Sequence, residues 1–180
     1  MERKLDIVIS QEEIENKLKE MGNTISRDYK GKDLVLISVL RGSVYFAVDL
    51  SRNLSIPFSL DFISISRYGE KTDTAGIVRI TKDLDLNVSN KHVLVIEDIV
   101  DTGLSLSYLI RNLETRNPAS IKVCTMLNIK ARRIVNVPLD YKGFDLPDIF
   151  VVGYGLDYNE GYRNLPYIAE FNKNIDKESQ

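Results

Sequence analysis

A short stretch near the middle of the chain carries residue types that can bind a phosphorylated sugar. The apolar run Val93–Ile96 predicts a strand buried on both faces of a parallel sheet. Glu97 and Asp98 follow it directly, and after two apolar residues comes Asp101–Ser105 (D-T-G-L-S), at the start of a predicted helix, Leu104–Leu113. Ligands of open α/β sheets bind outside the carboxyl ends of the strands. We therefore expect a ligand site at this junction.

The residue types of this junction suit two parts of one ligand. Backbone N–H groups of the turn 102–105, at the positive end of the predicted helix, suit a phosphate, and Gly103 allows its close approach. The carboxylates of Glu97, Asp98 and Asp101 would repel phosphate and instead suit sugar hydroxyls or a divalent cation. No G-x-x-x-x-G-K-[ST] loop occurs in the chain. The stretch therefore predicts a ligand such as ribose 5-phosphate.

The pattern of four apolar residues, two acids, two apolar residues and D-T-G-x-[ST] resembles the phosphoribosyl-diphosphate signature of the type I phosphoribosyltransferases. The resemblance covers almost the whole chain and is greatest to the bacterial hypoxanthine-guanine enzymes. It implies a reaction of 5-phosphoribosyl 1-diphosphate with a 6-oxopurine, hypoxanthine or guanine. The products would be IMP or GMP and diphosphate, with Mg²⁺ as the cofactor.

The same resemblance implies roles for individual residues. The catalytic residue would be Asp101, which faces the purine N7 as a proton acceptor. The phosphoribosyl group would be bound by Glu97, Asp98, Asp101, Thr102, Gly103, Leu104 and Ser105. Diphosphate would be bound by Arg41, Gly42 and Arg163. The purine would be bound by Lys130, Phe150, Val151 and Asp157. The metal ligands would be Glu97, Asp98 and Asp157, and the lid would include Arg67 and Tyr68.

Three positions depart from the family pattern. Arg41 replaces a lysine and Arg67 replaces a serine, which retains or adds positive charge. The family also places a lysine, which bonds the purine 6-oxo group, four residues before the arginine matching Arg133; Ile129 occupies that position here. Either the loop shifts by one residue so that Lys130 turns inward, or backbone N–H groups bond the oxo group. We expect the shift, because short surface loops accommodate a one-residue change.

Composition narrows the class of protein. The chain has 180 residues, of which 43% are hydrophobic, and it lacks an apolar run long enough to span a membrane. Its first residues, Met1–Lys4, lead into no apolar core typical of a signal peptide. A net charge of −2 argues against a nucleic-acid partner. The single cysteine, Cys124, fits a reducing cytoplasm, and the single histidine, His92, cannot supply a histidine-based triad. The family resemblance further implies a homodimer or homotetramer with small-molecule substrates.

Apolar patterns alternate between strands and helices along the chain. Ser10 and Glu13 predict a capping box at the start of a helix. Further helices are predicted at Val44–Leu54 and Leu104–Leu113. Strands are predicted at 5–9, Leu34–Leu40, Phe58–Ile65, Val93–Ile96, Ile121–Leu127 and Ile149–Val152.

This alternation predicts an α/β fold with a doubly wound, mainly parallel sheet, similar to the type I phosphoribosyltransferases. We expect a single domain over residues 1–180, with a core at about 28–153. The N- and C-terminal segments, about 1–10 and 154–175, would form a small hood over the site. The polar loop Ser66–Gly76, with two glycines, predicts a mobile lid.

Other functions fit these features less well. A regulatory RNA-binding relative on the same fold would carry tyrosine in place of Asp101 and a basic face, neither of which the sequence has. A receiver-like signalling domain gives the D-T-G-L-S turn no role. Within the enzyme class, xanthine or adenine remains the stronger alternative substrate.

Overall fold

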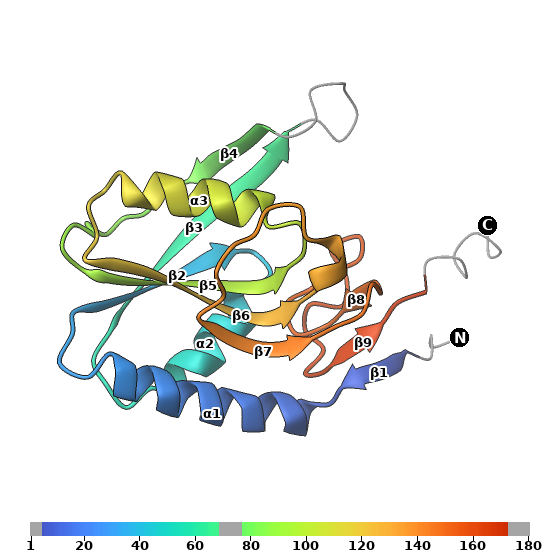
Figure 1. Ribbon diagram of the computed structural model, residues 1–180. Helices are drawn as coiled ribbons and strands as arrows, with labels where there is room; N and C mark the ends of the chain where they lie inside the picture. The colour runs from blue at the N-terminus through green and yellow to red at the C-terminus, as the bar shows by residue number, and fades with distance from the viewer. Residues whose placement is uncertain (1–4, 69–76, 173–180) are drawn as a thin grey trace.

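The computed structural model describes residues 5–68 and 77–172 and has an α/β fold with two sheets (Figure 1). The helices are α1 (Gln11–Asp28), α2 (Val44–Arg52), α3 (Leu104–Glu114) and the short 3-10 helix η1 (Lys130–Arg132). The strands are β1 (Asp6–Ile9), β2 (Leu34–Leu40), β3 (Ser59–Tyr68), β4 (Ile77–Lys82), β5 (His92–Val100), β6 (Ser120–Asn128), β7 (Tyr141–Asp145), β8 (Val151–Val152) and β9 (Ile168–Glu170).

The larger sheet has the strand order β4-β3-β2-β5-β6-β7. Five of these strands run parallel, and β4 is antiparallel to its neighbour β3. Every residue of β2 except its last is buried, as expected for a strand with neighbours on both sides and helices on both faces. The prediction of a doubly wound, mainly parallel sheet is confirmed.

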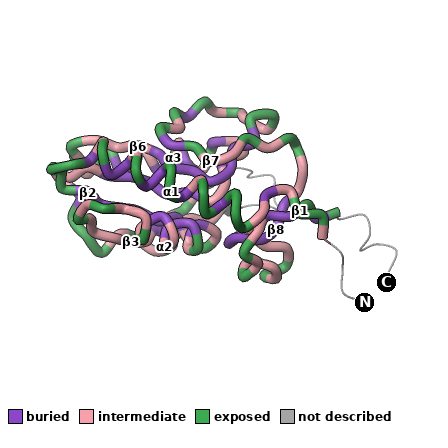
Figure 2. Tube along the Cα trace, turned by 90° about the horizontal axis from the view of Figure 1, so that it is seen from below, coloured by how far each residue is buried: buried purple, intermediate pink, exposed green. Residues whose placement is uncertain are grey.

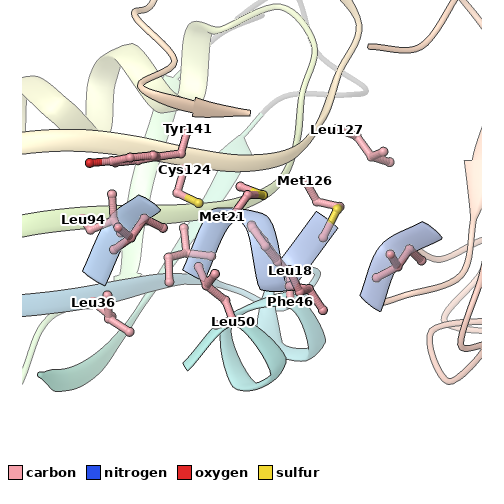
Figure 3. Close-up of a cluster of buried hydrophobic side chains, with 14 of the residues drawn as sticks. Leu18, Met21, Leu36, Phe46, Leu50, Leu94, Cys124, Met126, Leu127 and Tyr141 are labelled. Carbon is pink, nitrogen blue, oxygen red and sulfur yellow. The ribbon is translucent and has the colours of Figure 1, made fainter. Parts of the chain in front are cut away.

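Helices cover both faces of this sheet. In Figure 1, α1 and α2 lie below it and α3 lies above it. Leu36 and Leu94 face the lower layer, where they join Leu18 and Phe46 in one apolar core (Figure 3). Figure 2 shows that the buried residues follow the central strands and the inward faces of the helices. The alternate residues of the same strands face α3, in a second cluster that includes Val35, Ile37, Val93, Val95, Leu106 and Leu109.

The start of α1 is fixed by the predicted capping box. The backbone N–H of Glu13 donates to the Ser10 hydroxyl, and the Glu13 carboxylate accepts from the Ser10 backbone N–H at 2.8 Å. Both bonds satisfy N–H groups that the first turn of a helix leaves unpaired. The helix therefore begins directly after β1.

A separate three-stranded sheet has the order β1-β9-β8, so it joins the two ends of the described chain. β1 and β9 fall in the segments predicted as the hood, whereas β8 falls in the range predicted as core. The predicted strand Ile149–Val152 is corrected here: only Val151–Val152 is a strand, and it pairs antiparallel with β9.

The edge strand of the larger sheet, parallel to β6, is β7 and not the predicted strand Ile149–Val152. No strand was predicted at β7. Its residues, Tyr141–Asp145, mix aromatic, charged and glycine residues and therefore lack an apolar run. Gly143 lies against β6, where an added Cβ would come within 2.4 Å of the Met126 carbonyl oxygen.

No helix of the described residues is both long and apolar enough to cross a membrane.

Candidate active site

The junction of β5 and α3 forms the centre of the candidate site. β5 continues past Glu97 and Asp98, so both acids lie within the strand rather than after it. Gly103 begins the helix with a φ of 78°, and an added Cβ would be 2.4 Å from the Val135 carbonyl oxygen. The turn therefore requires glycine at this position for both its conformation and its packing.

A cavity of about 240 Å³ opens at the carboxyl ends of β2 and β5. It brings together residues predicted from separate parts of the sequence: Gly42, Glu97, Asp98, Asp101, Gly103 and Ser105. Two predicted residues of the turn, Thr102 and Leu104, do not line it. The Thr102 hydroxyl instead accepts from the Leu104 backbone N–H at 3.4 Å, and Leu104 is exposed.

The loop after β2 lies against this cavity because of two small residues. The Ser43 hydroxyl donates to the Val39 carbonyl oxygen at 2.7 Å, which ties the loop back to its own strand. A Cβ added to Gly42 would come within 1.5 Å of Asp98 Oδ2. Any other residue at this position would therefore displace the acid.

Asp98 is held in a poorly solvated position. Burial raises the pKa of its carboxyl to about 6, and the nearby Asp157 carboxylate acts in the same direction. The hydrogen bond from the Ile99 backbone N–H, at 2.8 Å, and the positive charge of Arg163 act in the opposite direction. By exposed surface Asp98 is half-buried, whereas its neighbour Glu97 is buried. Two adjacent acids with little water around them favour a ligand that supplies positive charge or hydroxyl donors.

A second cavity, of about 180 Å³, adjoins the first and shares Ile99 and Asp101 with it. Phe150 and Val151 line it, as predicted for the purine site. The Phe150 ring meets the Tyr158 ring edge to face, with centroids 6.1 Å apart, which fixes its plane. The wall is otherwise largely apolar and is suited to a flat aromatic ligand.

The two arginines predicted to bind diphosphate, Arg41 and Arg163, both contact the carboxylate of Glu160. Arg163 forms an ion pair with Asp157 at 2.8 Å and donates to the Gly155 carbonyl oxygen at 2.7 Å. Arg41 pairs with Glu160 at 2.6 Å, and Glu160 also lies 3.3 Å from Arg163. Glu160 had no predicted role.

The predicted metal ligands are divided between the two cavities. Glu97 and Asp98 line the first cavity, and Asp157 lines the second. Within residues 5–68 and 77–172, no three histidine, cysteine or acidic side chains are grouped so that they could hold a metal ion. The three predicted ligands therefore do not form a single cluster.

Lys130 is not brought to the second cavity. It is exposed in η1, whereas Ile129 is fully buried and lines the cavity wall. The Ile129 backbone N–H donates to the Val100 carbonyl oxygen at 3.0 Å, which holds Ile129 beside β5. The prediction that Lys130 turns inward is therefore wrong. Arg132, not Lys130, is the basic residue of this wall.

The phosphoribosyl transferase domain family matches the chain over residues 8–159. The chain belongs to that family. This phosphoribosyltransferase is 45% identical over 175 residues to the hypoxanthine-guanine phosphoribosyltransferase of Mycobacterium tuberculosis, with 94% of this chain and 87% of the relative covered. It is 43% identical over 172 residues to the hypoxanthine phosphoribosyltransferase of Escherichia coli, with 94% and 97% covered.

Solved structures are similar to the phosphoribosyltransferase over the same extent. A hypoxanthine phosphoribosyltransferase from Staphylococcus aureus has a TM-score of 0.90 at 40% identity, covering 94% of this chain and 92% of that one. A hypoxanthine-guanine phosphoribosyltransferase from Bacillus anthracis, solved with a HEPES molecule in its active site, has a TM-score of 0.89 at 44% identity. The match covers 94% of this chain and 100% of that one.

Arg133 is a site residue to which the sequence analysis gave no role. Its side chain donates to the Asp101 carbonyl oxygen at 2.7 Å and to the Val100 carbonyl oxygen at 3.1 Å, and it also bonds the Asn128 side chain. It therefore fixes the backbone of the phosphoribosyltransferase at the point where the two cavities meet. Its signals in the sequence were its match to an arginine of the family pattern and its place in the segment Lys130–Arg133, which has three basic residues.

The lid prediction falls partly outside the described residues. Ser66, Arg67 and Tyr68 are not loop residues, because β3 continues through them and pairs with β4, with Arg67 opposite Val78. Residues 69–76 of the predicted loop lie outside the part of the chain that the structure describes.

Replacing Asp98 by asparagine is expected to change how stability depends on pH. The folded-state pKa of Asp98 is raised, so the wild-type protein loses stability as the pH rises from about 4 through about 6. The asparagine side chain carries no charge and retains an oxygen that accepts from the Ile99 N–H. We therefore expect the variant to be about 1–3 kcal/mol more stable than wild type at pH 8 and nearly equal at pH 4.

Urea unfolding of metal-free protein at several pH values measures this difference. Asp33→Asn, at an exposed acid paired with Lys91, is the matched control and should follow the wild-type profile. A difference between Asp98→Asn and wild type that is constant across the pH range would contradict the raised pKa.

Proposed function

We propose that this phosphoribosyltransferase transfers the 5-phosphoribosyl group from 5-phosphoribosyl 1-diphosphate to hypoxanthine or guanine, as a step of purine salvage. The observation that carries the proposal is that Asp101 lines both cavities. A sugar phosphate in the first cavity and a purine in the second would meet beside this carboxylate. The names of the relatives support the choice of base.

The proposed reaction breaks the bond between the ribose C1′ and a diphosphate oxygen. Positive charge develops on the ribose ring, and negative charge develops on the leaving diphosphate. Arg41 and Arg163 suit the diphosphate, because a guanidinium group can bond two oxygens at once. The first cavity would hold the ribose against Glu97 and Asp98, and the turn at Gly103 would hold the 5′-phosphate.

Asp101 would accept the proton that the purine releases at N7 as the new bond forms at N9. Its carboxylate accepts from the Thr102 backbone N–H at 2.6 Å, which restricts its orientation. Arg133 holds the carbonyl group of the same residue. A general base positioned in this way contributes a rate factor of about 10²–10⁴.

Mg²⁺ fits the first cavity on the chemistry of its donor groups. It prefers oxygen ligands, and it is usually held by one or two carboxylates together with substrate phosphates rather than by a protein cage. Glu97 and Asp98 supply such a carboxylate pair, and a cation beside them would offset the burial that raises the pKa of Asp98. The ion would neutralise charge on the diphosphate.

Product formation from each base tests the proposed function. The protein is incubated with 5-phosphoribosyl 1-diphosphate, Mg²⁺ and hypoxanthine, guanine, xanthine or adenine in separate reactions. We expect IMP and GMP to form, and both reactions to stop when a chelator removes the metal ion. Product from adenine alone, or turnover that a chelator does not affect, would contradict the proposal.

Asp101→Asn is expected to lower kcat by about 10²-fold or more, because asparagine cannot accept the proton. It retains an oxygen for the Thr102 N–H, so the turn should keep its shape. The dissociation constant for 5-phosphoribosyl 1-diphosphate, measured by calorimetry, should change much less. Asp85→Asn, at an exposed acid outside both cavities, is the control. An equal loss of binding and rate would reassign Asp101 to substrate anchoring.

Arg132 is the side chain that we propose to bond the purine 6-oxo group. Its Nε donates to Asp148 and its Nη2 to the Ile149 carbonyl oxygen, while Nη1 has no hydrogen bond among the described residues. Ile129 offers the base no side-chain donor. A donor and an apolar residue suit an oxo group better than the amino group of adenine.

Arg132→Met should therefore raise the KM for hypoxanthine by about 10-fold or more, from the loss of a charge-assisted bond of about 1.5–3 kcal/mol. Lys130→Met should leave this KM nearly unchanged. Asp148→Asn breaks the ion pair but keeps the guanidinium, so it controls for the loss of the pair. A 10-fold increase for Lys130→Met with none for Arg132→Met would restore the role first predicted for Lys130.

We also propose that the enzyme is cytoplasmic and works as a homodimer or homotetramer. The buried, unpaired Cys124 supports a reducing compartment. The family resemblance supports the assembly. Arg67 and Tyr68 remain predicted lid residues, although they belong to the end of β3 and not to the loop.

A further inference from the structure

One carboxylate connects the two arginines that the proposed function assigns to diphosphate. Glu160 Oε1 lies 2.6 Å from Arg41 Nη2, and its Oε2 lies 3.3 Å from Arg163 Nη2. Glu160 and Arg163 are three residues apart, whereas Arg41 lies 119 positions before Glu160. Glu160 is the only ion-pair partner of Arg41 within the described residues. The carboxylate thus contacts both arginines where a diphosphate oxygen would.

The backbone around Glu160 holds this arrangement in place. The Glu160 N–H donates to Asp157 Oδ2 at 3.0 Å, which closes a tight turn. The Arg163 side chain donates to the Gly155 carbonyl oxygen, and Gly155 packs on the loop after β2. A Cβ added to Gly155 would come within 1.9 Å of the Gly42 carbonyl oxygen. The turn and the Arg41 loop are therefore in direct contact.

The charges of this cluster balance before any ligand binds. Arg41 and Arg163 face Asp157 and Glu160, so a diphosphate that pairs with both arginines competes with these acids for their positive charge. Glu160 is the acid that can move: its side chain is 61% exposed, against 31% for Asp157. Exposed ion pairs are weak, so its carboxylate can exchange with a bound anion.

We propose that Glu160 is an internal counter-anion that competes with diphosphate for Arg41 and Arg163. This inference rests on the proposed function, which assigns the two arginines to diphosphate. Glu160 contacts both guanidinium groups in the free enzyme and weakens diphosphate binding by the free energy of these two contacts. It thereby favours release of the diphosphate product.

The test is the affinity of Mg²⁺-diphosphate for wild type and variants, measured by calorimetry. Glu160→Gln keeps the size of the side chain and removes its charge. We expect it to bind diphosphate about 3- to 10-fold more tightly, the range for the loss of two weak competing ion pairs. Diphosphate should inhibit its reaction at correspondingly lower concentration.

Glu20→Gln is the matched control. Glu20 is also an exposed glutamate, pairs with Lys17 at 2.6 Å and lies on α1 outside both cavities. It changes the net charge by the same amount and should leave diphosphate affinity unchanged. Equal tightening in both variants would mean that overall charge, not the local contact, controls affinity, and would overturn the inference.

Arg41→Met separates failure of the inference from failure of the proposed function. If Arg41→Met weakens diphosphate binding but Glu160→Gln does not tighten it, Glu160 is not a competitor and the inference alone fails. If Arg41→Met leaves binding unchanged, Arg41 does not bind diphosphate and that part of the proposed function fails as well. Tightening by Glu160→Gln that disappears in the Arg41→Met background would support the competition directly.

Discussion

Close contact between three backbone segments at Gly42 is the constraint on which the candidate site depends. A side chain at Gly42 would meet Asp98 of β5, and a side chain at Gly155 would meet the backbone of Gly42. Two glycines therefore let the loop after β2, the end of β5 and the segment after β8 meet. Parallel strands bring their carboxyl ends to the same edge, and this contact closes that edge into two adjoining cavities.

The same contact involves the ionisable groups of the site. Gly42 lies directly against Asp98, and burial raises the pKa of this carboxyl to about 6. Arg163, held on Gly155, lowers that pKa, and Asp157 opposes it. Buried acids thus lie beside arginines that already have acid partners. A metal ion together with a phosphorylated ligand would satisfy both sets, as in the proposed binding of Mg²⁺ and 5-phosphoribosyl 1-diphosphate.

Local sequence patterns predicted the parts of the molecule that local patterns determine. The run before Glu97, the D-T-G-L-S turn and the Ser10 capping box each depend on residues close in sequence, and the structure has all three. β7 was missed because an edge strand needs no continuous apolar run. Lys130 was placed wrongly because the backbone bond of Ile129 to β5 is a long-range contact. The contact between Arg41 and Glu160 joins residues 119 positions apart, which no spacing rule records.

A crystal structure of the protein with bound IMP tests most directly whether the two cavities form one active site. We expect the 5′-phosphate at the turn that holds Gly103 and Ser105, the ribose hydroxyls at Glu97 and Asp98, and the purine N7 facing Asp101. The base would lie against Phe150. A nucleotide with its phosphate away from the turn, or with its base outside the second cavity, would show that the two cavities do not form one active site.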